Sequence, residues 1–153
     1  MMKFYQKIVS LVLLSSLILI GFTGCDSNEN VEDICGIKVD DLEGVSMKIK
    51  EGTLTKTGAT VIIIDTSARQ NIYGVGYGIE KEENGTWVEL KPRKDMFFTE
   101  EGYYVDENHT LEFSMNWESF YGKLTSGKYR VVKTTSEAME GIHHCITAKF
   151  VIE

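Results

Sequence analysis

The chain has 153 residues and a net charge of −7 at pH 7, and it is 42% hydrophobic and 25% charged, proportions that are ordinary for one globular domain. An acidic protein repels phosphate backbones, so the charge argues against nucleic acid as a partner. It also argues against peripheral electrostatic binding to anionic lipid, so any contact with a membrane needs another cause.

The first 25 residues predict such a cause. Lys3 and Lys7 precede an almost uninterrupted apolar run over residues 8–20, which has the length of a signal-peptide core and is short for a membrane-spanning helix. Residues 22–24, Phe-Thr-Gly, lead directly to Cys25, and this arrangement resembles the bacterial lipobox. We therefore expect cleavage after residue 24 and a lipid on Cys25, which would anchor the protein at the extracytoplasmic face of the cell membrane. The alternative is an uncleaved membrane helix followed by an incidental cysteine.

The residues after Cys25 divide into a tether and a domain. Residues 26–33, Asp-Ser-Asn-Glu-Asn-Val-Glu-Asp, are polar, acidic and without periodicity, which is typical of a flexible segment. We expect a signal peptide over 1–24, the lipidated cysteine and an acidic tether over 25–44, and one folded domain over 45–153.

The first half of the expected domain shows the patterns of β-strands. Residues 45–49 alternate between apolar and polar, and residues 59–65 include an unbroken β-branched run. Residues 73–80 alternate bulky side chains with glycine, which predicts one strand with a bare face that another group can approach closely. No helix follows these glycines, so a phosphate-binding loop is excluded. Asn84-Gly85 between two strand-like runs predicts a tight hairpin.

The second half continues in the same way, with one helical feature. Alternation predicts strands over 111–117, 129–134 and 146–152, and residues 136–144 read as a loop. Trp117, Phe120, Tyr121 and Leu124 have helical spacing, and Gly122 limits the helix to a short turn, which Asn116 could cap. About seven or eight short strands with close turns predict an all-β, antiparallel sandwich.

Four stretches carry a resemblance to a known family. They are residues 51–60, 77–87, 116–124 and 125–133. They resemble the presumed bacterial immunoglobulin-like domain of small Gram-positive lipoproteins, which is also attached to some membrane sensor proteins. The resemblance spans roughly residues 45–133, and it implies an immunoglobulin-like β-sandwich with a binding or structural role and no catalytic residues.

Part of the family motif has a physical interpretation. The motif residues are Trp117, Tyr121, Leu124, Gly127 and Tyr129. The last three are spaced like the corner of immunoglobulin-like sandwiches, in which a tyrosine hydroxyl returns to the backbone and fixes a connection between the two sheets. We interpret all five as structural.

Cys35 and Cys145 are the two cysteines that remain after Cys25. Thiols outside the cytoplasm usually pair, and the first and last strands of a sandwich can lie close together, so we predict a disulfide between them. The alternative is two free thiols, because sequence does not show proximity.

The remaining polar candidates give no catalytic or metal site. His143 and His144 adjoin Cys145, but adjacent residues on a strand point to opposite faces, which is poor geometry for one metal ion. Glu112 and Glu118 are interpreted as solvated charges and His109 as a turn residue. We expect no enzyme activity, no metal and no cofactor.

The aromatic side chains allow two interpretations. Five of them, Tyr73, Tyr77, Trp87, Trp117 and Tyr121, could line a binding face for sugars or peptides, but aromatic residues at this spacing are more often core. The sequence therefore predicts a non-catalytic binding or structural module on a lipid anchor, with an envelope protein or a cell-wall component as its partner. An accessory to a membrane sensor and a metal-binding or enzymatic lipoprotein are the alternatives.

Overall fold

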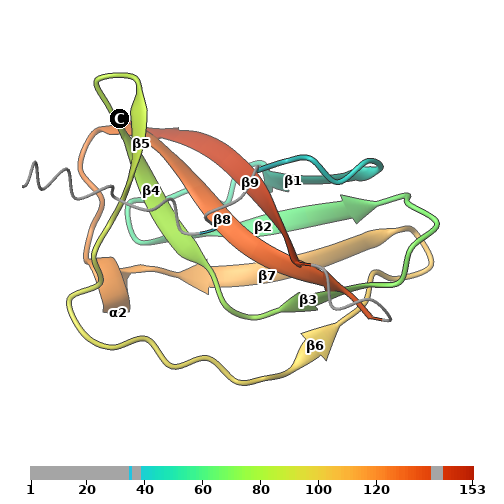
Figure 1. The fold of residues 1–153 in the computed structure, drawn as a ribbon. Coiled ribbons are helices and arrows are strands. Elements are labelled where there is room, and N and C mark those ends of the chain that lie inside the picture. The colour runs from blue at the N-terminus through green and yellow to red at the C-terminus, as the bar shows by residue number, and fades with distance from the viewer. Residues whose placement is uncertain (1–34, 36–38, 139–142) are drawn as a thin grey trace, which may run out of the picture. The chain divides into compact units, whose positions relative to one another are not determined.

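The structure is a computed structural model that describes residue 35 and residues 39–138 and 143–153 (Figure 1). The chain divides into two compact units, Met1–Asn30 and Val31–Glu153, and all described residues belong to the second. The expected signal peptide, Cys25 and most of the expected tether lie outside the described residues.

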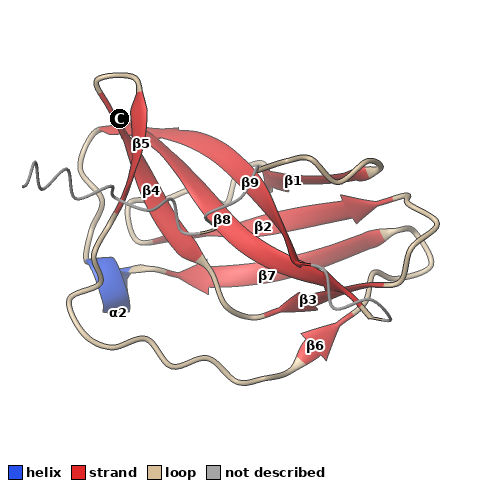
Figure 2. Ribbon diagram, in the orientation of Figure 1, coloured by secondary structure: helices blue, strands red, loops and turns tan. Residues whose placement is uncertain are grey.

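The described part of the chain is built from strands, with one short helix. The elements are β1 Val45–Ile49, β2 Gly58–Asp65, β3 Asn71–Gly74, β4 Gly78–Glu83, β5 Thr86–Glu89, β6 Gly102–Tyr103, β7 Thr110–Asn116, α2 Glu118–Tyr121, β8 Gly127–Glu137 and β9 His143–Ile152 (Figure 2). The predicted all-β class is confirmed.

The strands form two antiparallel sheets. One sheet has the order β1-β2-β7, and the other has the order β5-β4-β8-β3-β6 with β9 along β8. The long strand β8 organises the second sheet, because β4 pairs with its first half, β3 pairs with its second half and β9 pairs with its whole length. The predicted immunoglobulin-like sandwich is confirmed.

The core fills the space between the two sheets. Alternation sets Val61 and Ile63 of β2 against Ile79 of β4 and Val131 of β8, and all four are fully buried. At one end of the core, the ring of Phe150 stacks against Trp117 at 5.3 Å and against Tyr129 at 5.7 Å between centroids. Burial of this apolar surface is the main source of stability for such a fold.

The strand predicted over residues 73–80 is wrong, because the structure divides it into β3 and β4. The amine of Lys133 donates hydrogen bonds to the carbonyls of Gly74 at 2.6 Å and Gly76 at 2.8 Å. Because these two carbonyls accept from a side chain, they do not take part in the hydrogen bonds between strands. The chain bends here, and β3 and β4 pair with β8 at two separate places. The ring of Phe98 would lie 3.5 Å from a Cβ on Gly76, an ordinary van der Waals contact, so no group approaches this glycine more closely than a side chain would allow.

Several local expectations hold. Asn84 and Gly85 have φ of 52° and 83° and join Glu83 to its partner Thr86, which confirms the hairpin. The helical turn is present as α2. Its N-cap is Trp117 and not Asn116, although the Asn116 side chain does accept a hydrogen bond from the Glu118 amide at 3.1 Å.

Two boundaries differ from those expected. Residues 136–144 were expected to be a loop, but β8 runs to Glu137 and β9 begins at His143, so the described hairpin is longer. The folded part also begins before Val45: Leu42 is buried, and Val39 forms a parallel bridge with Cys145. The end of β8 also pairs with β3, and Val39 pairs with Cys145, so both extensions involve partners distant in the sequence that a local pattern does not contain.

Candidate functional site

The motif residues form a structural corner between β7 and β8. The Tyr129 hydroxyl donates a hydrogen bond to the carbonyl of Thr125 at 2.9 Å, and Leu124 is buried beside it. The indole of Trp117 is fully buried and donates to the carbonyl of Lys56 at 3.0 Å, while Tyr121 is 7% exposed. These side chains therefore hold the connection between the sheets.

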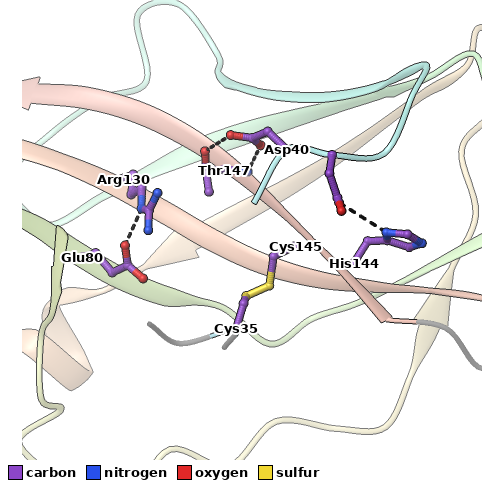
Figure 3. The surroundings of a disulfide bond; sticks show 8 residues. Cys35, Asp40, Glu80, Arg130, His144, Cys145 and Thr147 are labelled. Carbon is purple, nitrogen blue, oxygen red and sulfur yellow. Dashed lines mark hydrogen bonds and ion pairs between the residues drawn. A yellow bond between two sulfur atoms is a disulfide. The ribbon is translucent and has the colours of Figure 1, made fainter. Parts of the chain in front are cut away.

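The structure joins Cys35 to Cys145 in a disulfide (Figure 3). The two Cα atoms are 6.2 Å apart, and Cys145 is fully buried in β9. Asp40 strengthens the same junction: its amide donates to the Cys145 carbonyl at 2.7 Å, and its carboxylate accepts from the Thr147 amide at 2.6 Å and hydroxyl at 2.5 Å. The segment before β1 is thus fixed to β9 by a covalent bond and by hydrogen bonds.

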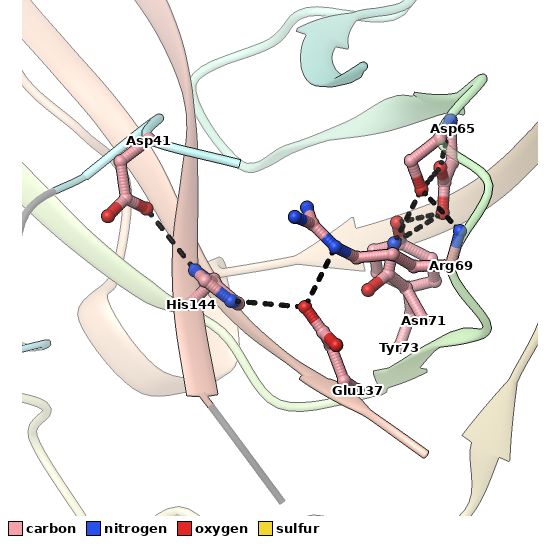
Figure 4. Close-up of polar contacts among 8 residues, drawn as sticks. Asp41, Asp65, Arg69, Asn71, Tyr73, Glu137 and His144 are labelled. Atoms are coloured by element: carbon pink, nitrogen blue, oxygen red, sulfur yellow. Dashed lines mark hydrogen bonds and ion pairs between the residues drawn. The ribbon is translucent and has the colours of Figure 1, made fainter. Parts of the chain in front are cut away.

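The two histidines separate, as alternation predicts. His143 pairs with Ser136 and His144 with Thr135, so their side chains lie on opposite faces of β9. Nδ1 of His144 lies 3.4 Å from Asp41 and Nε2 lies 3.7 Å from Glu137, whose carboxylate pairs with Arg69 at 3.1 Å (Figure 4). Within the described ranges, no three His, Cys, Asp or Glu side chains form a group that could hold a metal ion.

The outer face of the larger sheet carries an aromatic and charged cluster. Ile79 and Val131 face the core, so their neighbours Glu80 and Arg130 lie on the opposite face of the sheet. There they form an ion pair and are nevertheless buried. The Arg130 guanidinium lies 4.9 Å and the Lys149 amine 6.0 Å from the centroid of the Trp87 ring. These are cation–π distances.

A surface groove of about 400 Å³ lies beside this cluster. It is lined by Glu82, Trp87, Lys128, Tyr129, Lys149, Phe150 and Val151. Lys128 is paired with Glu82 at 3.0 Å, whereas Lys149 has no carboxylate partner among the described residues. An indole beside an unpaired amine can bind a ligand that combines an apolar face with an acidic group.

A match to one family covers most of the described chain. The model of the bacterial Ig-like domain matches residues 41–150. The chain belongs to this family. Comparison with curated proteins and with solved structures gave no match. The match begins at residue 41, in agreement with a bacterial Ig-like domain whose folded part includes the segment before β1.

Three of the aromatic candidates of this Ig-like domain are core residues. Tyr73, Trp117 and Tyr121 are at most 7% exposed, while Tyr77 and Trp87 are partly exposed. The core interpretation of the aromatic pattern is therefore correct for the first three, and Trp87 is the one that lines the groove.

The acidic candidates and His109 have structural surroundings. Glu112 pairs with Lys50 at 2.8 Å, and Glu118 is exposed on α2. His109 lies in the turn before β7 with a φ of 61°. These groups are spread over the surface and do not form a catalytic constellation. The described part of the chain also contains no helix of the length and apolarity needed to cross a bilayer.

Besides the buried Glu80–Arg130 pair, sequence reasoning missed two further buried polar centres of the Ig-like domain. Lys133 is 1% exposed, and its amine lies 4.2 Å from the centroid of the Phe113 ring. Burial lowers the pKa of Lys133 to about 8. Alternation could have found this residue, because Lys133 has the same parity in its strand as the core residues Tyr129 and Val131.

The second centre is the carboxylate of Asp65, which is 3% exposed. It accepts hydrogen bonds from the amide and hydroxyl of Ser67, from the Asn71 side chain at 2.9 Å and from the Tyr73 hydroxyl at 2.8 Å (Figure 4). Burial raises the pKa of Asp65, but these donors together outweigh burial and lower it. Burial of the Tyr73 hydroxyl and its contact with Asp65 raise the pKa of Tyr73. This network joins β2 to β3.

Proposed function

We propose that the protein is a membrane-anchored extracytoplasmic lipoprotein whose Ig-like domain is a non-catalytic binding or structural module. The disulfide between Cys35 and Cys145 carries the proposal, because such bonds persist outside the cytosol and are rare within it. The apolar run over residues 8–20 and the lipobox that ends at Cys25 supply the matching export and lipidation signals.

The buried polar groups of the described domain support the proposal that it is non-catalytic. Its buried polar groups are used in structure, and the family is typically a structural module. The groove beside Trp87 is the best candidate for contact with an envelope protein or a cell-wall component, because a large aromatic ring and a cation are typical of binding hot spots.

The anchoring half is tested by the N-terminus of the protein purified from membranes. Mass spectrometry should find a first peptide that begins at Cys25 and carries a diacylglycerol. The Cys25→Ala chain should keep residues 1–24 and carry no lipid. An unmodified N-terminus on the wild-type protein would overturn the lipoprotein assignment.

The binding half is tested by crosslinking in intact cells. A partner that uses the groove should crosslink to the wild-type protein and be lost with Trp87→Ala, while Tyr104→Ala, which removes another exposed aromatic ring, should keep it. Circular dichroism of both variants checks that the sandwich is intact. Equal recovery of the partner with both variants would exclude the groove as the contact.

A further inference from the structure

The connection from β5 to β6 is long and is held against α2. It covers residues 90–101 and passes beside α2 (Figure 2). The Arg93 amide donates to the carbonyl of Phe120 at 2.7 Å, and the Lys94 amine lies 5.4 Å from the centroid of the Phe120 ring. The Arg93 guanidinium also lies against Gly122, where a Cβ would collide with it. These contacts therefore fix the connection in place against α2.

This contact assembles four cations, Lys91, Arg93, Lys94 and Lys123, which we call the basic surface. All four side chains are exposed, and none has a carboxylate within 4 Å among the described residues. The nearest acids along the chain are Glu89, Asp95 and Glu118, so the four cations outnumber these acids by one, in a protein whose net charge is −7. Two cations elsewhere in the domain, Lys50 and Lys128, are paired with glutamates, whereas Lys149 beside the groove is not.

An aromatic side chain projects beside the basic surface. Phe97 is 86% exposed, more than any other large hydrophobic residue in the part of the chain that the structure describes. Its neighbours are turned inward: Met96 packs against the core, and the ring of Phe98 lies 5.9 Å from Phe120 and 5.6 Å from Tyr77. The inward neighbours hold Phe97 outward. Exposure of such a ring is unfavourable in water and favours a partner that buries it.

We propose that the basic surface and Phe97 dock the domain on an anionic lipid bilayer. Cations attract the lipid phosphates, and an aromatic ring enters the boundary between headgroups and acyl chains. This proposal rests on the proposed lipid anchor. Nine residues lie between Cys25 and Cys35, and this segment spans at most about 35 Å, so the domain stays within reach of the bilayer. The acidic remainder of the domain is repelled by anionic lipid, which selects this surface as the docking face.

The test uses the mature protein, purified from membranes and reconstituted into vesicles of phosphatidylcholine alone or with about one-third phosphatidylglycerol. A Phe97→Trp variant reports insertion through quenching of its fluorescence by brominated lipid, after subtraction of the wild-type emission from Trp87 and Trp117. We expect strong quenching with phosphatidylglycerol and little without it. Equal quenching in both vesicles, or none in either, would overturn the proposal.

Charge reversal distinguishes the effect of the basic surface on the quenching from the effect of the net charge of the protein. Lys91→Glu with Lys123→Glu in the Phe97→Trp protein should abolish the quenching, because each lysine at an anionic surface contributes about fivefold to partitioning. Lys48→Glu with Arg69→Glu changes the net charge equally at exposed positions outside both the basic surface and the groove beside Trp87, and it should leave most of the quenching. An equal loss in the two pairs would contradict the proposal, and thermal unfolding shows that both pairs fold.

Two further outcomes show whether the phosphate comes from lipid or from a soluble polymer, and whether Cys25 carries a lipid. If a soluble polyglycerol phosphate removes the quenching at phosphate concentrations far below that of the lipid, the surface binds a polymer and the bilayer proposal fails. The N-terminal mass of the same preparation reports the lipid on Cys25 independently. A protein without that lipid but with phosphatidylglycerol-dependent quenching would refute the anchor and keep the docking surface.

Discussion

At the scale of single residues, the buried polar groups show how the sandwich tolerates charge in its interior. The amine of Lys133 has two carbonyl acceptors and an aromatic ring, and the carboxylate of Asp65 has donors from three side chains and one amide. Burial without such partners costs several kcal/mol per ionised group. The two centres differ in one respect: the hydrogen bonds of Asp65 favour its charged form, whereas burial of Lys133 disfavours its charged form.

Lys133 therefore predicts a rise in stability with pH. Its pKa is about 8 in the folded protein and 10.5 in the unfolded chain, so between these values the unfolded chain binds the proton and the folded chain does not. Stability rises with pH wherever the unfolded state binds more protons. The unfolding free energy should increase from pH 7.5 to 9.5 by on the order of 2 kcal/mol. Urea unfolding across this range measures the increase.

The matched variant is Lys133→Met, which keeps a long side chain and removes the titrating amine. Its stability should stay flat over the same range. The comparison must stop below pH 10, because burial raises the pKa of Tyr77 and Tyr121 to about 12. Above pH 10 the unfolded chain loses tyrosine protons that the folded chain keeps, and stability falls. Parallel curves for the two proteins below pH 9.5 would refute the assignment to Lys133.

At the scale of elements, the hairpin between β4 and β5 depends on backbone conformation alone. Gly85 has a φ of 83°, and a Cβ there would meet no atom within 4 Å. Gly85→Ala should therefore lower the unfolding free energy by about 1 kcal/mol through left-handed strain and without any clash. Thermal unfolding measures the change. Asn84→Gly should be close to neutral, since residue 84 also has a positive φ, and a large loss there would contradict this explanation.

The same hairpin shows which elements the sequence can predict. Asn84-Gly85 and the alternation over residues 45–49 depend on neighbours in the chain, and both predictions are confirmed. The division of residues 73–80 depends on Lys133, more than 50 residues later, whose amine takes the two glycine carbonyls. No local pattern contains that partner.

The candidate sites follow the same division. The sequence could nominate Cys35 and Cys145, because cysteines are few and reactive, and it could place Tyr129 in a corner from its spacing. It could not assemble the basic surface, because Lys91 and Lys123 come together only through the contact between Arg93 and Phe120. The groove beside Trp87 likewise draws its lining from four strands.

At the scale of the whole molecule, the covalent link connects the chain just before the folded domain to its last strand. The disulfide spans 110 positions in sequence and ends in β9, whose other edge pairs with β8. Any load between the proposed anchor at Cys25 and a ligand on the domain would enter the sandwich at this link. The neighbouring hydrogen bonds of Asp40 to Cys145 and Thr147 hold the same junction without a covalent bond.

Removal of the disulfide should therefore lower stability and preserve the fold. In the chain-entropy model, a link that closes a loop of this length contributes about 4 to 5 kcal/mol by restricting the unfolded chain. Cys35→Ala with Cys145→Ala should lose a comparable free energy in urea unfolding and keep the β-sheet circular dichroism of the wild type. Reduction of the wild-type protein should give the same loss and leave the double variant unchanged. A reduced protein as stable as the oxidised one would show that the link does not restrain the unfolded chain.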